Sequence, residues 1–154
     1  MPSWDYSIKN LDPDRTAIAS GRDLRISYKA AYEICNFIRG MPLSKAQAYL
    51  EEVVKKKKPI PFKRYTGKAA HHGGMEGWAI LRYPVKAARE ILKLLKNVEA
   101  NAEFKGLDTE KLKIIHIAAM KGPKMKKYIE RAFGRSSPFF EQLTHIEVAV
   151  SEEE

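Results

Sequence analysis

The chain lacks the features that mark several large protein classes. It has one cysteine, Cys35, among 154 residues, which excludes a disulfide framework and any zinc site built from several cysteines. Its longest apolar runs have four residues, far below the roughly 20 that a bilayer-spanning helix needs, so we expect no membrane insertion. The first ten residues contain no apolar signal region, so we also expect no secretory route.

Catalytic and metal motifs are missing as well. No HExxH, CxxC, GxGxxG or Walker pattern occurs. His71 and His72 are adjacent, which does not suit a zinc site, and His116 and His145 lie in apolar, strand-like segments where we expect them to pack or hydrogen-bond within a sheet. The sequence therefore predicts no catalytic residue, metal or cofactor. A small RNA-processing enzyme that uses His116, His145 or an acid stays open, because general acids and bases need not be neighbours in sequence.

Positive charge, in contrast, is abundant and grouped. Lys and Arg number 28 against 19 Asp and Glu, which gives a net charge of +9. Residues 55–68 hold seven basic side chains and no acid, and residues 121–135 hold six and one acid, whereas residues 136–154 hold five acids and no Lys or Arg. Such segregation favours a polyanionic partner, nucleic acid first. For lysines 55–58 the alternative is a solvated helix end, where cations suit the helix dipole.

Apolar periodicity predicts three helices. The first runs over 27–39 with Ser27 as its N-cap, and the second starts at Ser44, which forms a capping box with Gln47, and stops before Pro59. The third runs from Pro84 to Gly106 and has the clearest apolar stripe. That stripe comprises Ala88, Ile91, Leu92, Leu95, Val98 and Ala102. Cys35 falls on the apolar stripe of the first helix, which indicates a core residue rather than a nucleophile.

The two ends of the chain are predicted to be extended. Residues 1–26 should form an N-terminal extension and a first strand, with turns over 12–14 and 20–23. Strand patterns recur over 112–120 and 143–150. The segment between these two strands, residues 121–142, could form a two-stranded arm with Gly134 near its bend. At ~3.3 Å per residue, its outgoing strand would reach roughly 40 Å, farther than a domain of this size could bury. An acidic tail over 151–154 closes the chain.

Residues 59–83 form a loop rich in glycine, proline, histidine and aromatic residues. Its length is unusual for a connection inside a compact domain, which indicates a function or a docked partner. We expect its basic and aromatic side chains to contact RNA. These are Lys63, Arg64, Tyr65, Lys68, His71, His72 and Arg82.

The order of motifs resembles a known family over residues 27–150. IRGM, RYPVKAA, NAEFKGLD and IIHIAAMKGPKMKKY are followed by RAFGR and THIEVAV. This pattern is similar to that of large-subunit ribosomal protein twenty-two, called protein seventeen in eukaryotes. The combination of GPKMKKY, RAFGR and THIEVAV is specific, and the loop with PFKRY, HH and GW resembles the archaeal and eukaryotic branch.

The resemblance implies an α+β fold in a single domain: a small three-stranded antiparallel sheet packed on three helices, with a long protruding β-hairpin. It also implies a non-enzymatic, ribosome-bound, cytoplasmic protein whose partners are large-subunit ribosomal RNA, neighbouring large-subunit proteins and, at the tunnel wall, the nascent polypeptide. Carried over by position, the RNA-binding residues of the arm are Lys121, Lys124, Lys126, Lys127, Arg131 and Arg135. The tunnel tip comprises Arg131, Ala132, Phe133, Gly134 and Arg135, and His145 matches the histidine of the returning strand.

The arm also departs from the family pattern. Phe133 stands where many members carry a polar or basic residue, and Glu130 stands where bacterial members have proline. The returning segment SSPFFEQL lacks a basic run, and stacking of Phe139 or Phe140 on bases could substitute for phosphate contacts. Besides the enzyme considered above, a free-standing RNA-binding regulator remains an alternative, because it would need the same basic blocks.

Overall fold

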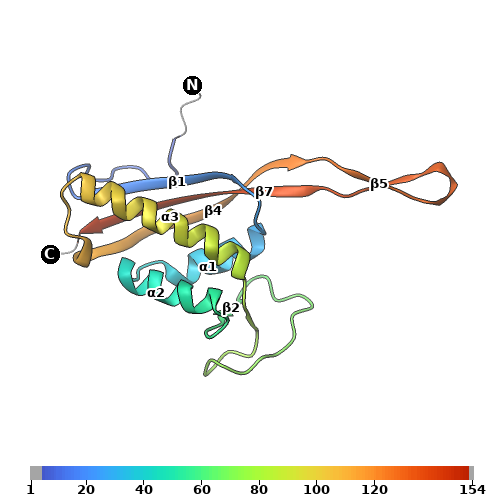
Figure 1. Cartoon of the computed structure of the whole chain (residues 1–154), viewed down its shortest axis with the longest axis horizontal. Coiled ribbons are helices and arrows are strands. Elements are labelled where there is room, and N and C mark those ends of the chain that lie inside the picture. Colours follow the sequence, from blue (N-terminus) through green and yellow to red (C-terminus); the bar gives the residue numbers. More distant parts are fainter. Residues whose placement is uncertain (1–4, 153–154) are drawn as a thin grey trace.

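The computed structural model of the chain describes residues 5–152, and within them three α-helices pack on a three-stranded antiparallel sheet (Figure 1). The sheet contains β1 (Thr16–Leu24), β4 (Leu112–Met125) and β7 (Glu141–Glu152) in the order β1-β7-β4. The helices are α1 (Tyr28–Ile38), α2 (Leu43–Val54) and α3 (Val85–Phe104). This arrangement confirms the predicted α+β class. No helix among the described residues is long and apolar enough to cross a membrane.

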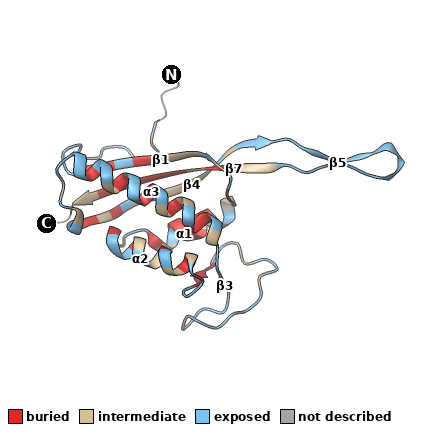
Figure 2. Cartoon of the chain, viewed as in Figure 1, coloured by how far each residue is buried: buried red, intermediate tan, exposed pale blue. Residues whose placement is uncertain are grey.

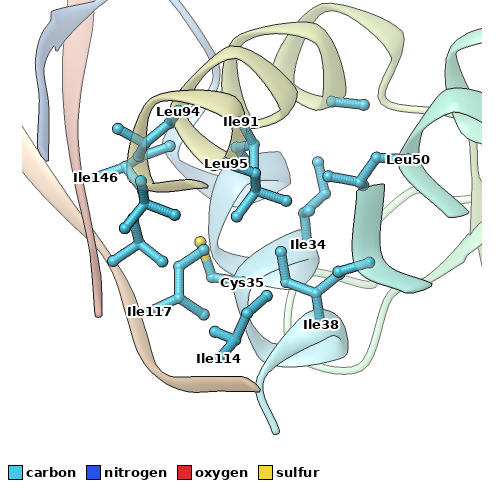
Figure 3. Packing of buried hydrophobic residues seen from close by; sticks show 14 of the residues in the cluster. Ile34, Cys35, Ile38, Leu50, Ile91, Leu94, Leu95, Ile114, Ile117 and Ile146 are labelled. Carbon is cyan, nitrogen blue, oxygen red and sulfur yellow. The ribbon is translucent and has the colours of Figure 1, made fainter. Parts of the chain in front are cut away.

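The core fills the space between the helices and the sheet (Figure 3). Its fully buried members come from all three helices and all three strands of the sheet, and they include Ala17, Ile34, Cys35, Ile38, Leu50, Leu95, Ile114, Ile117 and Ile146. Ile114 and Ile117 both belong to the core, although they are three positions apart and would lie on opposite faces of a regular strand, because the register of β4 against β7 shifts between Ile114 and His116. The burial of Cys35 confirms its predicted place in the core.

The predicted N-cap of the second helix, Ser44, is wrong by two residues. Pro42 occupies the N-cap position of α2, and among the described residues no side chain caps this end of the helix. The predicted capping-box partner Gln47 instead donates a hydrogen bond from Nε2 to Glu99 on α3 at 2.8 Å. The reason lies in tertiary pairing, since the Gly40 N–H donates to the Ile114 carbonyl of β4 and thereby fixes the chain just before the helix.

The turn predicted over 20–23 is also wrong. These residues belong to β1, and the pairing of β1 with β7 shifts between Gly21 and Leu24. Gly21 and Asp23 lie at an irregularity of the strand rather than at a reversal of the chain, and Asp23 has a positive φ of 53°. The turn predicted over 12–14 is present, with the Asp14 N–H donating to Asp12 Oδ1 at 3.1 Å.

The arm continues β4 and β7 out of the body of the molecule. The two strands pair from Leu112↔Glu152 to Met125↔Glu141, and beyond them β5 (Tyr128–Glu130) pairs with β6 (Ser136–Pro138). A tight turn, η2 (Ala132–Gly134), closes the tip, with Phe133 in a non-helical, left-handed conformation. Nearly the whole arm is exposed (Figure 2).

The loop over 59–83 leaves the body on the side of α1 and α2 and is largely exposed (Figures 1 and 2). It is more regular than its composition predicts, because β2 (Ile60–Pro61) pairs with β3 (Leu81–Arg82) and closes it at the base. A short 3₁₀ helix, η1 (Thr109–Lys111), joins α3 to β4. The predicted acidic tail begins inside β7, which includes Ser151 and Glu152, and residues 153–154 lie outside the described residues.

Candidate RNA interface

The basic loop is anchored to α1 by one buried carboxylate. Glu33 is only 2% exposed and accepts the backbone N–H groups of Lys63 at 3.2 Å, Arg64 at 2.8 Å and Tyr65 at 2.8 Å. Three successive amides directed at one carboxylate fix the backbone of this segment. The exposed side chains of Lys63 and Arg64 therefore project from a rigid base.

An aromatic cluster stands beside this anchor. The rings of Tyr28 and Tyr32 on α1 and of Tyr65 on the loop lie with their centres 5.5–6.2 Å apart. The Arg64 guanidinium lies over the Tyr32 ring at 5.2 Å and donates a hydrogen bond to the Tyr32 hydroxyl at 3.2 Å. That hydrogen bond raises the pKa of Arg64 above its ordinary value. The Lys29 ammonium lies 5.7 Å from the centre of the Tyr65 ring. Cations and π-faces thus alternate on this surface.

Two cavities flank the start of α1. The first has a volume of about 510 Å³ and the second about 530 Å³, and both are lined by Ser27 and Lys29. The first cavity extends to the loop, where Tyr65 and Arg82 line it. The second extends to the base of the arm, where Lys121 lines it. The start of α1 therefore connects the two basic regions that the sequence shows as separate blocks.

The other predicted loop residues are exposed and lie farther along the loop. The Lys63 ammonium lies 4.7 Å from the centre of the Trp78 ring, and the carbonyl of Lys68 accepts a hydrogen bond from Arg82 at 3.5 Å. His71 forms an isolated bridge with Ile80 across the loop, and the His72 N–H donates to the Ala79 carbonyl at 2.9 Å. The cations of the loop are thus spread along its length, and Arg82, near its end, lines the first cavity.

Sequence reasoning missed three residues of this surface. Lys29 and Tyr28 belong to the first turn of α1, and Tyr83 precedes α3 and is 38% exposed. A signal existed for Lys29 and Tyr28, because both lie on the polar side of a helix whose apolar face was identified. Nothing in the sequence indicated that Tyr83, the last residue of the loop, would meet residues 62–67 and the start of α1 at one cavity.

The arm carries its predicted cations on exposed positions. At its base, the Lys121 ammonium lies 5.5 Å from the centre of the Tyr28 ring. Lys127 pairs at 3.8 Å with Glu141, which also receives two hydrogen bonds from Arg25 at 2.8 and 3.0 Å. The Arg25 guanidinium holds the pKa of Glu141 below its ordinary value. The other arm cations, Lys124, Lys126, Arg131 and Arg135, are exposed along the outgoing strand and at the tip.

The tip displays a single large ring. Phe133 is 99% exposed and has a φ of 60°, a left-handed conformation that non-glycine residues adopt only occasionally. Ala132 precedes Phe133, and Gly134 follows it with a φ of 63°. The Arg131 N–H donates to the Arg135 carbonyl at 2.8 Å and closes the turn. The tip therefore presents an aromatic ring between two cations.

The two strand histidines serve the sheet, as predicted. The His145 Nδ1 accepts the Asp23 N–H at 3.0 Å. The His116 Nε2 lies 3.0 Å from a carboxylate oxygen of the fully buried Glu147 and 3.1 Å from the Ser7 hydroxyl. In a Ser-His-Asp triad the histidine uses opposite ring nitrogens for its carboxylate and its nucleophile, whereas one nitrogen of His116 faces both the Glu147 carboxylate and the Ser7 hydroxyl. Among residues 5–152, no three His, Cys, Asp or Glu side chains are grouped so that they could hold a metal ion.

The fold and its basic surfaces define a class: small α+β proteins whose cation-rich arm extends beyond their own core. The chain belongs to one family of that class, ribosomal protein L22p/L17e, whose model matches residues 19–151. It is 55% identical to the large ribosomal subunit protein uL22 of Ignicoccus hospitalis, with both chains covered in full. It is 51% identical to the uL22 of Methanopyrus kandleri, over 97% of this chain and 96% of the other. It is 49% identical to the uL22 of Methanocaldococcus jannaschii, over 99% and 97%. These archaeal relatives confirm the predicted family and branch.

Proposed function

We propose that the protein is a structural constituent of the large ribosomal subunit that binds ribosomal RNA, supports subunit assembly and lines the polypeptide exit tunnel with the tip of its arm. Membership of the L22p/L17e family, over nearly the whole length of archaeal large-subunit proteins, carries this conclusion. The family is a structural, non-enzymatic part of the ribosome, so the protein is ribosome-bound in the cytoplasm and has no catalytic role of its own.

The geometry supports RNA and neighbouring ribosomal proteins as its partners. An exposed arm with six cations needs a polyanion around it, and the anchored loop adds further cations on the same molecule. Contacts with RNA phosphates would offset the repulsion between the six cations of the arm. Contact of Phe133 with the nascent polypeptide at the tunnel wall is the finer part of the proposal, and its support is the exposure of that ring at the tip.

The loop's part in RNA binding can be tested through salt dependence. Replacing Lys63, Arg64 and Lys68 together by alanine should weaken binding to a large-subunit RNA transcript. Each lost phosphate contact should also make the slope of log affinity against log salt shallower by about 0.7–0.9. Replacement of Lys55, Lys56 and Lys57 is the charge-matched control, because these lysines lie in the turn after α2 and are outside the proposed interface. Equal effects of both triple variants would show that the loop contributes only general charge.

Association with the subunit itself is the broader test. The protein should sediment with the large subunit at both low and high salt. Release at moderate salt, or sedimentation apart from the subunit, would favour the free-standing RNA-binding regulator.

A further inference from the structure

We propose that the cavity between the start of α1, the basic loop and the segment before α3 binds one unpaired nucleotide of RNA, with its base among aromatic side chains and its phosphate among cations. This inference rests on the proposed function and assigns one kind of nucleotide to one place on the interface.

The cavity is built from three segments that are far apart in sequence. Residues 27–30 at the start of α1, residues 62–67 of the loop and residues 82–84 before α3 surround it. Its volume of about 510 Å³ lies within the range of roughly 300–1,000 Å³ that small-molecule sites occupy. A single nucleotide is a ligand of that size, whereas a double helix is far too wide to enter.

The lining has the two chemistries that a nucleotide needs. Phe62, Tyr65 and Tyr83 contribute aromatic side chains. Lys29, Arg64 and Arg82 contribute cations, and none of the described residues that line the cavity is acidic. Single-stranded RNA is recognised largely by stacking of splayed-out bases on aromatic rings and guanidinium planes, combined with cations along the backbone. A carboxylate of a neighbouring protein would use the cations and leave the aromatic side chains unused.

The cavity wall is held in place before any ligand arrives. Glu33 fixes the backbone of residues 63–65 through three hydrogen bonds, and the Tyr32 hydroxyl accepts a hydrogen bond from Arg64. In the same lining, the Arg82 guanidinium lies 5.5 Å from the centre of the buried Phe62 ring. Side chains that are already ordered lose less entropy when they bind, which favours a specific site over general attraction to phosphate.

The surface beside the cavity provides a path for the rest of the strand. Lys29 lines both cavities, and the second one adds Arg25, Lys86 and Lys121 before it reaches Phe140 at the base of the arm. Glu141 also lines the second cavity, where its carboxylate is paired with Arg25. A strand that leaves the first cavity across the start of α1 therefore meets more cations than acids on its way to the arm. This continuity distinguishes the site from an isolated pocket for a free metabolite.

The test compares a nucleotide with its sugar phosphate on the full-length chain. Titration with AMP and with ribose 5-phosphate, followed by NMR shifts of the amides of residues 27–30 and 63–67, measures the contribution of the base. AMP should bind at least about fivefold more tightly, in keeping with the energy of one base stacked on an aromatic ring. Tyr65→Leu should abolish that preference, and Arg82→Ala should weaken binding of both ligands. Lys57→Ala, a charge-matched change outside the cavity, should preserve the preference.

The variants are interpreted only where their amide spectra retain the pattern of the folded core, and Arg82→Ala, at an exposed position, provides a second route if Tyr65→Leu does not fold. Equal affinity of the unmodified protein for AMP and ribose 5-phosphate would overturn the proposal, because the site would then recognise phosphate alone. Stronger shifts of the same amides with an Asp/Glu-rich peptide than with AMP would overturn it in favour of an acidic segment of a neighbouring protein. Either result leaves the proposed function standing if the chain still sediments with the large subunit, whereas failure to sediment would count against that function whatever AMP does.

Discussion

At the scale of single residues, two buried side chains of α1 have different tasks. Cys35 is packed in the core and fills space, whereas Glu33 lies on the same helix and holds the loop through three backbone amides. Burial of this carboxylate is tolerated because three amide hydrogen bonds replace its hydration.

Removing the Glu33 carboxylate should loosen the loop more than the core. Glu33→Ala leaves three amides without their acceptor, so the free energy of unfolding should fall by about 1–3 kcal/mol. Hydrogen exchange at residues 63–65 should accelerate at the same time. Glu51→Ala, at an exposed position of α2, is the matched control and should change neither quantity. Unchanged exchange at residues 63–65 in Glu33→Ala would show that other contacts hold the loop.

The Cys35 thiol should be inert in the folded protein. Burial raises its pKa to about 12, so the reactive thiolate is scarcely populated near neutral pH. A disulfide reagent at pH 8 should label it only as fast as the protein unfolds. Because the folded pKa is raised, the associated stability is complete below the unfolded pKa of about 8.5. It should decline as the pH rises from there toward 12. Rapid labelling of the native protein would contradict this account.

At the scale of elements, sequence periodicity predicted the helices and the strands but not where α2 begins or where β1 becomes irregular. The stripe of α3 and the alternation of β7 follow directly from burial on one side. The start of α2 and the irregularity of β1 depend instead on pairing with β4 and β7, which no local pattern contains. The candidate RNA interface also has parts that the sequence predicts and parts that it does not. The cations of the loop and the arm were visible in the sequence, but the cavity was not, because it needs three distant segments to meet.

The α3 stripe gives a prediction about packing. Leu95 is fully buried, so Leu95→Ala should lower the free energy of unfolding by ~2–5 kcal/mol through lost burial and a residual cavity. Phe104→Ala on the same helix is the control. The Phe104 ring is 94% exposed, so its loss should change stability by less than about 0.5 kcal/mol. Urea unfolding of both variants measures the difference, and similar values for the two would show that the stripe does not carry the packing.

At the scale of the whole molecule, the body and the arm are stabilised in different ways. The body has a contiguous core, whereas β5 and β6 lie outside it and their residues are almost wholly exposed. An isolated two-stranded ribbon is marginally stable in water at best. The arm's order should therefore come from its surroundings in the ribosome.

Shortening the arm should separate these two contributions. Replacing residues 129–137 by Asn-Gly joins the paired Tyr128 and Pro138 through a two-residue turn. The melting temperature of the free protein should change by no more than about 2 °C, because no core contact is lost. Incorporation into subunits should persist, and interaction with particular nascent chains should change. Hydrogen exchange is the check: in the free protein, amides 123–140 should exchange much faster than amides 146–150. Strong protection of the arm in the free protein would show that it is a self-stable hairpin.

The continuity of β4 and β7 from the core into the arm has a mechanical consequence. The arm is joined to the sheet at its base, where the register of β4 against β7 shifts between Lys121 and Lys124. Close packing sets the angle at this point, since a Cβ on Gly122 would lie 2.9 Å from His145 Cε1 and 3.3 Å from the Leu143 carbonyl oxygen. Because the arm is roughly 40 Å long, a rotation of the arm by about 5° about its base would displace the tip by about 3–4 Å. In the arm as ordered by its surroundings, a methyl group added at Gly122 would therefore displace Phe133, eleven residues further along the chain.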